Sequence, residues 1–218
     1  TYDTIGKHEE ALKDYGQCIA IRESLHEAGR LYDLNDLATA YMNRGVTLKN
    51  MGKYEEALKD YGKCIAIMES LHEAGRLYDE NDLAQAYMNR GGTYWSTGKY
   101  EEALKDYGKC IAIRESLHEA GRLYDENDLA TAYMNRGGTY WSTGKYEEAL
   151  KDYGKCIAIR ESLHEAGRLY DENDLASAYM NRGVTYSTVG KYEEALKDYG
   201  QCIAIMESLH EAGRLYDE

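Results

Sequence analysis

The sequence KYEEALKDYGKCIAIMESLHEAGRLYDENDLAQAYMNRGGTYWSTG occupies residues 53–98, and close copies of it follow one another along the 218-residue chain. The five cysteines share a constant interval of 46 residues, and they are Cys18, Cys64, Cys110, Cys156 and Cys202. A period that covers the whole chain is typical of a tandem-repeat architecture. Residues 82–127 and 128–173 differ only at Gln85 and Thr131, which indicates either recent tandem duplication or deliberate design.

Two apolar stripes within each repeat predict two amphipathic helices, because their residues recur at steps of three and four. The stripe of the first helix, which we name helix B, consists of Tyr54, Ala57, Leu58, Tyr61, Cys64, Ile65, Met68 and Leu71. The stripe of the second, helix A, consists of Leu83, Tyr87, Gly91 and Tyr94, and Gly98 is a natural left-handed stop after it. From this periodicity we also expect Leu104 of a later helix B to be buried.

The boundary between the two helices follows from their lengths, because antiparallel neighbours must cover similar distances. A helix B that ran on to Tyr78 would exceed helix A by roughly 13 Å at about 1.5 Å per residue. We therefore predict that helix B stops near Ala74 with Gly75 as its left-handed C′ residue. Helix A then begins after Asp79 as N-cap, with Asp82 in its first turn.

Stacking of these hairpins completes the predicted architecture, since no single hairpin can bury both of its faces. The sequence predicts an all-α fold, an α-solenoid of antiparallel helix-turn-helix repeats in one domain over residues 1–218. We expect a partial repeat at residues 1–33 and full repeats at residues 34–79, 80–125, 126–171 and 172–218.

The composition disfavours several classes of partner. The net charge of −13 argues against nucleic acid, because binding a polyanion relies on lysines and arginines that displace counterions. A neutral or basic protein surface fits better. No run approaches the roughly 18 apolar residues of a membrane span and no signal-peptide pattern is visible, so we expect a cytoplasmic protein without membrane contact. Thr1 is not an initiator methionine, so further segments could precede it.

Cysteine and histidine each recur once per repeat, which separates potential metal ligands by a full repeat. A metal site needs ligands clustered in one locality, and a disulfide framework needs paired cysteines. We therefore expect buried thiols in a reducing compartment, exposed histidines, no metal and no cofactor. The histidines that recur at the repeat interval are His26, His72, His118, His164 and His210.

The order of residue types along the repeat resembles the tetratricopeptide repeat over essentially the whole chain. The matching positions of one copy are Tyr87, Gly91, Tyr94, Ala103 and Tyr107. Arg90 at the usual leucine position and Cys110 at the last alanine depart from the family pattern. The repeat is about twelve residues longer than the common form, a lengthening similar to that of kinesin light chain-like proteins. The resemblance implies a right-handed solenoid.

The resemblance also implies that the A helices line a concave groove that holds a peptide or helix of a partner protein. The helix-A face that is not used for packing steps by three and four, so its residues share one side. The candidate groove residues are Met42, Asn43, Gln85, Met88, Asn89, Trp95, Thr131, Met134, Asn135, Trp141, Met180 and Asn181.

Differences between the repeats fall mostly on this helix-A stripe, while the B helices hardly change. The three variable positions hold Thr39, Gln85, Thr131 and Ser177; Val46, Gly92, Gly138 and Val184; and Lys49, Trp95, Trp141 and Ser187. Either the groove residues are adapted to a partner, or the exposed positions have changed without functional consequence. The tryptophans could form an adaptable apolar patch with the methionines or lie flat against the next helix A.

The groove asparagines, such as Asn89, match a family position that grips a peptide backbone in some long repeats, and an amide offers both donor and acceptor. The alternative is hydrogen bonding within or between repeats. Met88 and Gly92 stand where a carboxylate-binding clamp of the family has lysine and asparagine, which disfavours acidic C-terminal tails. The arginines at the leucine position need partners, either a carboxylate such as Asp60 or Glu56 or an acidic group in the groove.

Catalysis requires unlike residues that converge on one point, whereas this chain repeats the same side chains, so we do not expect an enzyme. Two functions remain. The first is a module that binds a protein or peptide in the groove. The second is a structural array or homo-oligomer that stacks end to end. The chain starts midway through a helix A at Thr1-Tyr2 and stops at Glu218 after a helix B without polar caps, and unprotected solenoid ends tend to stack.

Overall fold

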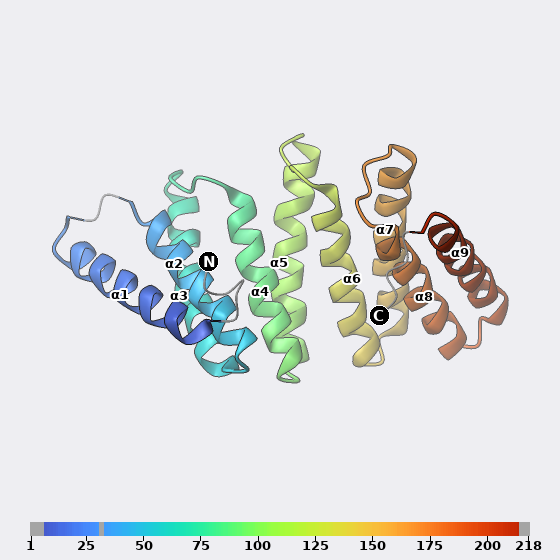
Figure 1. Ribbon diagram of the computed structural model, residues 1–218, viewed down its shortest axis with the longest axis horizontal. Coiled ribbons are helices and arrows are strands. Elements are labelled where there is room, and N and C mark those ends of the chain that lie inside the picture. The colour runs from blue at the N-terminus through green and yellow to red at the C-terminus, as the bar shows by residue number, and fades with distance from the viewer. Residues whose placement is uncertain (1–6, 31–32, 214–218) are drawn as a thin grey trace. The chain divides into compact units, whose positions relative to one another are not determined.

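The computed structural model describes residues 7–30 and 33–213, and these residues form nine α-helices and no strand (Figure 1). The helices are α1 (His8–Glu27), α2 (Asn35–Asn50), α3 (Tyr54–Glu73), α4 (Glu80–Ser96), α5 (Tyr100–Glu119), α6 (Glu126–Ser142), α7 (Tyr146–Glu165), α8 (Glu172–Thr188) and α9 (Tyr192–Glu211). Odd-numbered helices are the predicted B helices and even-numbered helices the predicted A helices. The expected all-α repeat solenoid is confirmed. The helix-A end predicted at Thr1-Tyr2 lies outside the described residues, and the repeat boundaries remain a prediction.

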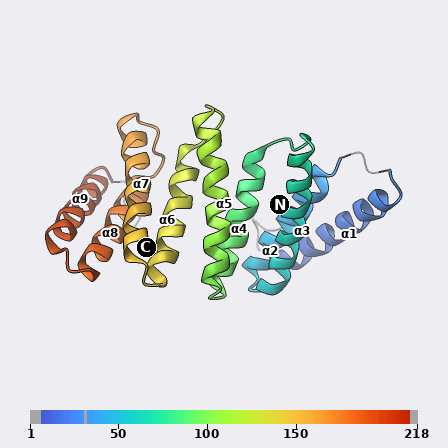
Figure 2. The ribbon, with the colours of Figure 1, turned by 180° about the vertical axis from the view of Figure 1, so that it is seen from behind.

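Two compact units divide the chain, residues 1–113 and residues 114–218, and the division falls within α5. In the first unit α1 packs against α2, α2 against α3, and α3 against α4. In the second unit α6 packs against α7, α7 against α8, and α8 against α9, and the view from behind shows the same neighbours side by side (Figure 2). Within each unit, contacts therefore follow chain order, as expected of stacked hairpins.

The helix ends lie where the length argument puts them. Helix α3 ends at Glu73, and Gly75 has a φ of +64°. The Arg76 amide donates to the Leu71 carbonyl at 2.8 Å and the Gly75 amide donates to the His72 carbonyl at 3.0 Å, which is the Schellman pattern. Helix α4 begins after Asp79, whose carboxylate accepts a hydrogen bond from the Asn81 amide at 2.8 Å. The glycine stop, the N-cap and the similar helix lengths are thus confirmed.

The core of each repeat lies between its A and B helices. In the repeat of α3, the buried residues of the stripe are Ala57, Tyr61, Cys64, Ile65, Met68 and Leu71. Helices A and B approach closely because a glycine faces each core tyrosine. A Cβ atom at Gly91 would lie 3.0 Å from Cε1 of Tyr107, so a side chain here would force the helices apart.

The outer edge of the stripe is less buried than its periodicity predicts. Leu104 and Leu58 are only half-buried, and Tyr54 is exposed. The prediction that Leu104 is buried is therefore wrong, because this position faces the margin of the interface between helices. Asp106 is buried in its place, since it pairs with an arginine of the adjacent helix A.

Candidate protein-binding surface

The predicted groove residues lie on α2 and α4 in the first unit and on α6 and α8 in the second. We call these residues the A-helix surface. Trp95 and Trp141 are its largest exposed side chains, with 47% and 41% of their surface accessible. Asn43, Asn135 and Asn181 are exposed as well. Gln85, Asn89, Thr131 and Met134 are half-buried, and Met180 is exposed.

The structure buries two methionines that the sequence placed on the open face. Met42 and Met88 are both buried. The Nδ2 atom of Asn89 donates to Sδ of Met42 at 3.6 Å, so Met42 lies beneath the A helix of the next repeat. Met42 is therefore not an open groove residue, and the low exposure of Met88 contradicts its assignment to an open groove as well.

The asparagine side chains make contacts within and between repeats. The Nδ2 atom of Asn181 donates to Sδ of Met134 at 3.5 Å, as Asn89 does to Met42, and Nε2 of Gln85 donates to Oδ1 of Asn89 at 3.2 Å. Thioether sulfur is a weak acceptor. An amide that donates to sulfur can therefore exchange this contact for a stronger acceptor at little cost.

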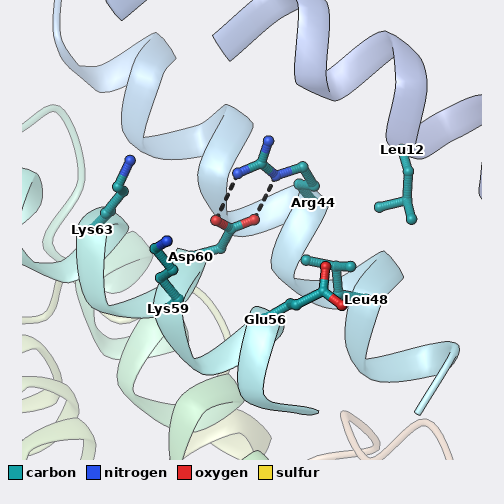
Figure 3. Close-up of a pocket in the computed structure, with 7 residues that line it drawn as sticks. All are labelled: Leu12, Arg44, Leu48, Glu56, Lys59, Asp60 and Lys63. Carbon is teal, nitrogen blue, oxygen red and sulfur yellow. Dashed lines mark hydrogen bonds and ion pairs between the residues drawn. The ribbon is translucent and has the colours of Figure 1, made fainter. Parts of the chain in front are cut away.

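Every arginine at the family's leucine position forms a two-bond fork with an aspartate of the following helix B. In the repeat of α2, Nε and Nη2 of Arg44 donate to the two carboxylate oxygens of Asp60 at 2.6 and 2.7 Å (Figure 3). The hydrogen bond to Asp60 is the largest cause of the raised pKa of Arg44. The other forks are Arg90–Asp106, Arg136–Asp152 and Arg182–Asp198. The predicted ion pair is confirmed in all four of these arginines.

The first fork borders a cavity of about 350 Å³ that includes Leu12 of α1 and Leu48 of α2 (Figure 3). Later repeats carry a tyrosine in place of Leu48, and the ring centroid of Tyr94 lies 5.9 Å from Cζ of Arg90. A tyrosine therefore covers the fork in later repeats, whereas Leu48 is too short to do so.

A second repeated cluster joins three helices and was not predicted. The hydroxyl of Tyr87 in α4 donates to Glu69 of α3, and Nζ of Lys109 in α5 donates to the Tyr87 hydroxyl at 2.9 Å. Lys109 also pairs with Glu69 at 3.1 Å. The hydrogen bond to Tyr87 helps to lower the pKa of Glu69 against the opposing effect of burial. The same spacing of glutamate, tyrosine and lysine in three copies was the available signal, and the last copy has Gln201 in place of the lysine.

Two fully buried arginines were also missed. Arg114 and Arg160 occupy the helix-B position that holds Met68 in another repeat. The guanidinium of Arg160 donates to the carbonyl of Asp174 at 2.8 Å and to Oδ1 of Asn127 at 3.0 Å, so it joins the N-terminal ends of α6 and α8. The alternation of methionine and arginine at one core position was the signal for this contact.

The thiols and histidines lie where their spacing suggests. Four of the five cysteines are buried, and burial raises the pKa of Cys156 to about 11. The histidines from His26 to His210 are exposed. Among residues 7–30 and 33–213, no three His, Cys, Asp or Glu side chains are grouped so that they could hold a metal ion. None of the described helices combines the length and apolar character needed to cross a bilayer.

Comparison with known proteins agrees with this geometry. A tetratricopeptide repeat profile matches residues 36–116, 82–162 and 128–208, and a second profile of the same repeat matches residues 1–25. The chain therefore belongs to the tetratricopeptide repeat family. Helical repeat scaffolds of this family commonly serve in protein–protein interaction. A search of curated proteins by sequence finds no match.

Several solved structures share the fold at low sequence identity. BtubC (BKLC) from P. vanneervenii superposes with a TM-score of 0.79 at 20% identity, over 100% of this chain and 79% of BtubC. MamA gives a TM-score of 0.69 at 20% identity, over 96% of this chain and 95% of MamA. A putative kinesin light chain from Podosopora anserina with nearly identical repeats gives 0.69 at 15% identity, over 95% and 90% of the two chains. At these identities the likeness shows the fold alone.

Proposed function

We propose that this protein is an interaction scaffold that binds a peptide or a helix of a partner protein on the A-helix surface. The observation that carries the proposal is the exposure of Trp95 and Trp141 at positions where the repeats differ. Tryptophan is the residue type most enriched among side chains that dominate binding energy. A large aromatic ring that is held on a rigid helix loses little conformational entropy when a partner covers it.

The asparagine contacts support this proposal. Asn89 and Asn181 donate to methionine sulfur, and such a weak hydrogen bond is easily replaced by one to a peptide carbonyl oxygen. A partner backbone would gain directional hydrogen bonds in this way, while the tryptophans supply apolar contact. Because an asparagine amide binds the backbone of a peptide and does not distinguish its side chains, the variable positions would determine which peptide sequences bind.

A peptide-library screen against the intact chain, followed by affinity measurements on the selected peptides, tests the proposal. We expect Trp95→Ala to weaken binding by about tenfold or more, and Asn89→Ala to weaken it by a smaller factor. Lys105→Ala is the matched control, since Lys105 is exposed on a B helix outside the A-helix surface. Equal affinities for all three variants and the parent chain would remove the A-helix surface as the binding site.

A second candidate function, self-association, is favoured by a different observation on α9. Ile203 is 54% exposed although its counterpart Ile157 in α7 is 2% exposed, and Leu196 is exposed as well. A helix A covers the same face of α7, so a helix of a second copy is a fitting partner for α9. Light scattering over a concentration series tests this candidate. An increase of particle mass with concentration that Ile203→Lys suppresses supports the array. A constant monomer mass at every concentration excludes it.

A further inference from the structure

One variable position of the A-helix surface controls access to a tyrosine hydroxyl. It holds Val46 in the repeat of α2 and Gly92 in the repeat of α4. Val46 packs against the cluster formed by Leu48, Ala57 and Tyr61, and the Tyr61 side chain is fully buried. Valine therefore covers the tyrosine in that repeat.

Gly92 leaves the corresponding space empty above Tyr107. A Cβ atom built on Gly92 would lie 3.6 Å from the Tyr107 hydroxyl and 3.6 Å from Nζ of Lys49. Both polar atoms therefore border the place where a side chain is missing. Tyr107 is only 3% exposed, and no hydrogen bond to its hydroxyl is found among the described residues. We call the space bounded by Lys49, Gly92 and Tyr107 the Gly92 notch.

Lys49 is the one lysine among the four residues at its repeat position, where the other copies have tryptophan or serine. It lies in the last turn of α2 and forms no ion pair with any described residue. Trp95 stands three residues after Gly92 on α4, a spacing that puts both residues on one side of the helix. The notch thus offers a cation and a neutral hydroxyl donor, with an exposed tryptophan on the same side of α4.

We propose that the Gly92 notch binds the carboxylate of an aspartate or glutamate side chain in the partner segment. This proposal rests on the proposed function, because it names the chemistry of one subsite on the A-helix surface. Lysine has donors and no acceptor, and a phenol readily donates, so a group with two acceptor oxygens and negative charge satisfies both. The net charge of −13 does not oppose this, because repulsion from distant charges is screened within about 8 Å at physiological salt.

The Gly138 notch provides an internal reference. A Cβ atom at Gly138 would lie 3.7 Å from the Tyr153 hydroxyl, and no cation of the described residues in the second unit lies within 4 Å of that point. Trp141 stands three residues later, as Trp95 does after Gly92. Both notches combine a glycine with a tyrosine hydroxyl, and the repeat position that holds Lys49 before Gly92 holds Trp95 before Gly138, so only the Gly92 notch has an ammonium group.

Fluorine NMR on fluorotryptophan-labelled protein gives two assignable signals, because the chain has only two tryptophans, and Trp95 stands three residues after Gly92 while Trp141 lies one repeat further along the chain. The probes are two blocked tripeptides, acetyl-Gly-Glu-Gly-amide and its glutamine counterpart. We expect the glutamate peptide to shift the Trp95 resonance and to bind about threefold to tenfold more tightly than the glutamine peptide. The Trp141 resonance should not distinguish the two peptides.

Two substitutions native to other repeats test the assignment without disturbing the fold. Lys49→Ser installs the residue found at Ser187, and Gly92→Val installs the residue found at Val46. Each variant should remove the preference for glutamate over glutamine and leave the circular dichroism spectrum and the Trp141 resonance unchanged. Tyr107→Phe should weaken the preference without loss of stability, since none of the described residues forms a hydrogen bond with its hydroxyl.

Several outcomes would overturn the carboxylate subsite. These are equal binding of both tripeptides, no response at Trp95, or a glutamate preference that survives Gly92→Val and Lys49→Ser. The failure of this inference is distinct from that of the proposed function. If library-selected peptides still bind and Trp95→Ala still weakens them, the A-helix surface binds peptides without reading acidic side chains.

Discussion

Removing the carboxylate of one buried fork should cost far more stability than its hydrogen-bond distances alone suggest. In the fork of α6 and α7, Nε and Nη2 of Arg136 donate to Asp152 at 2.6 and 2.8 Å. The Asp152 side chain is 3% exposed and that of Arg136 is 20% exposed. Asp152→Ala therefore leaves a guanidinium in the protein interior with neither its partner nor full access to water.

The magnitude follows from this burial. Removing one partner of a buried ion pair costs about 3–5 kcal/mol, and the partial exposure of Arg136 places the expected loss near the lower end, at about 3 kcal/mol. The exposed pair of Lys99 and Glu55 has a similar distance of 3.0 Å. Glu55→Ala should cost less than about 1 kcal/mol, because water solvates both groups when the pair is broken.

Urea unfolding followed by circular dichroism measures the total loss, and native-state hydrogen exchange locates it in α6 and α7. Arg136→Ala with Asp152→Ala should cost less than the sum of the single variants, since the double variant buries no unpaired charge. A loss below about 1 kcal/mol for Asp152→Ala, or a loss equal to that of Glu55→Ala, would show that burial does not set the contribution of the forks to the free energy of unfolding.

Two further predictions concern the cavity beside the first fork and a buried thiol. Leu48→Tyr should place a ring beside Arg44 and stabilise the chain by about 0.5–1 kcal/mol. Thermal melting measures the gain, with Leu48→Ala as the comparison variant. An unchanged melting temperature for Leu48→Tyr would mean that the ring does not reach Arg44. Burial raises the pKa of Cys156 from an ordinary 9.0 to about 11, so the folded state favours the neutral thiol. Its contribution to stability is complete below the unfolded pKa and falls as the pH rises from about 9 to about 11. The urea midpoint should fall less steeply with pH across this range for Cys156→Ala than for the parent chain. The same slope of midpoint against pH for both proteins would contradict the effect.

Helix ends and forks could be predicted from the sequence because each follows from a constraint between two helices that are consecutive in the chain. Antiparallel helices must match in length, which selects Gly75 and Asp79 as the boundary. A guanidinium at a core position must find a carboxylate, which makes an aspartate of the next helix B the natural partner of Arg44. Neither argument requires knowledge of how closely the side chains of successive A helices cover one another.

The extent of burial on the A-helix surface could not be predicted, because it depends on the contact between successive repeats. Helical periodicity places Met42 on the correct side of α2, but it does not tell how far the next A helix covers that side. Asn89 of α4 reaches Met42, so the methionine is buried. Leu104 fails for the opposite reason, since its side of the helix faces the margin of the contact.

The positions that vary between repeats are explained by the contacts each residue makes rather than by exposure alone. Position 68 is buried yet alternates between methionine and arginine, because each residue finds partners: Met68 contacts the thiol of Cys64, and Arg114 donates to the carbonyl of Asp128. A fork residue cannot change in the same way, since its partner would be left charged and buried. The change from Val46 to Gly92 adds no contact within the protein and leaves an empty space beside the hydroxyl of Tyr107. Glycine at this position gives the fold no added contact. Among the variable positions, this is therefore where we expect a bound group to gain the most contacts.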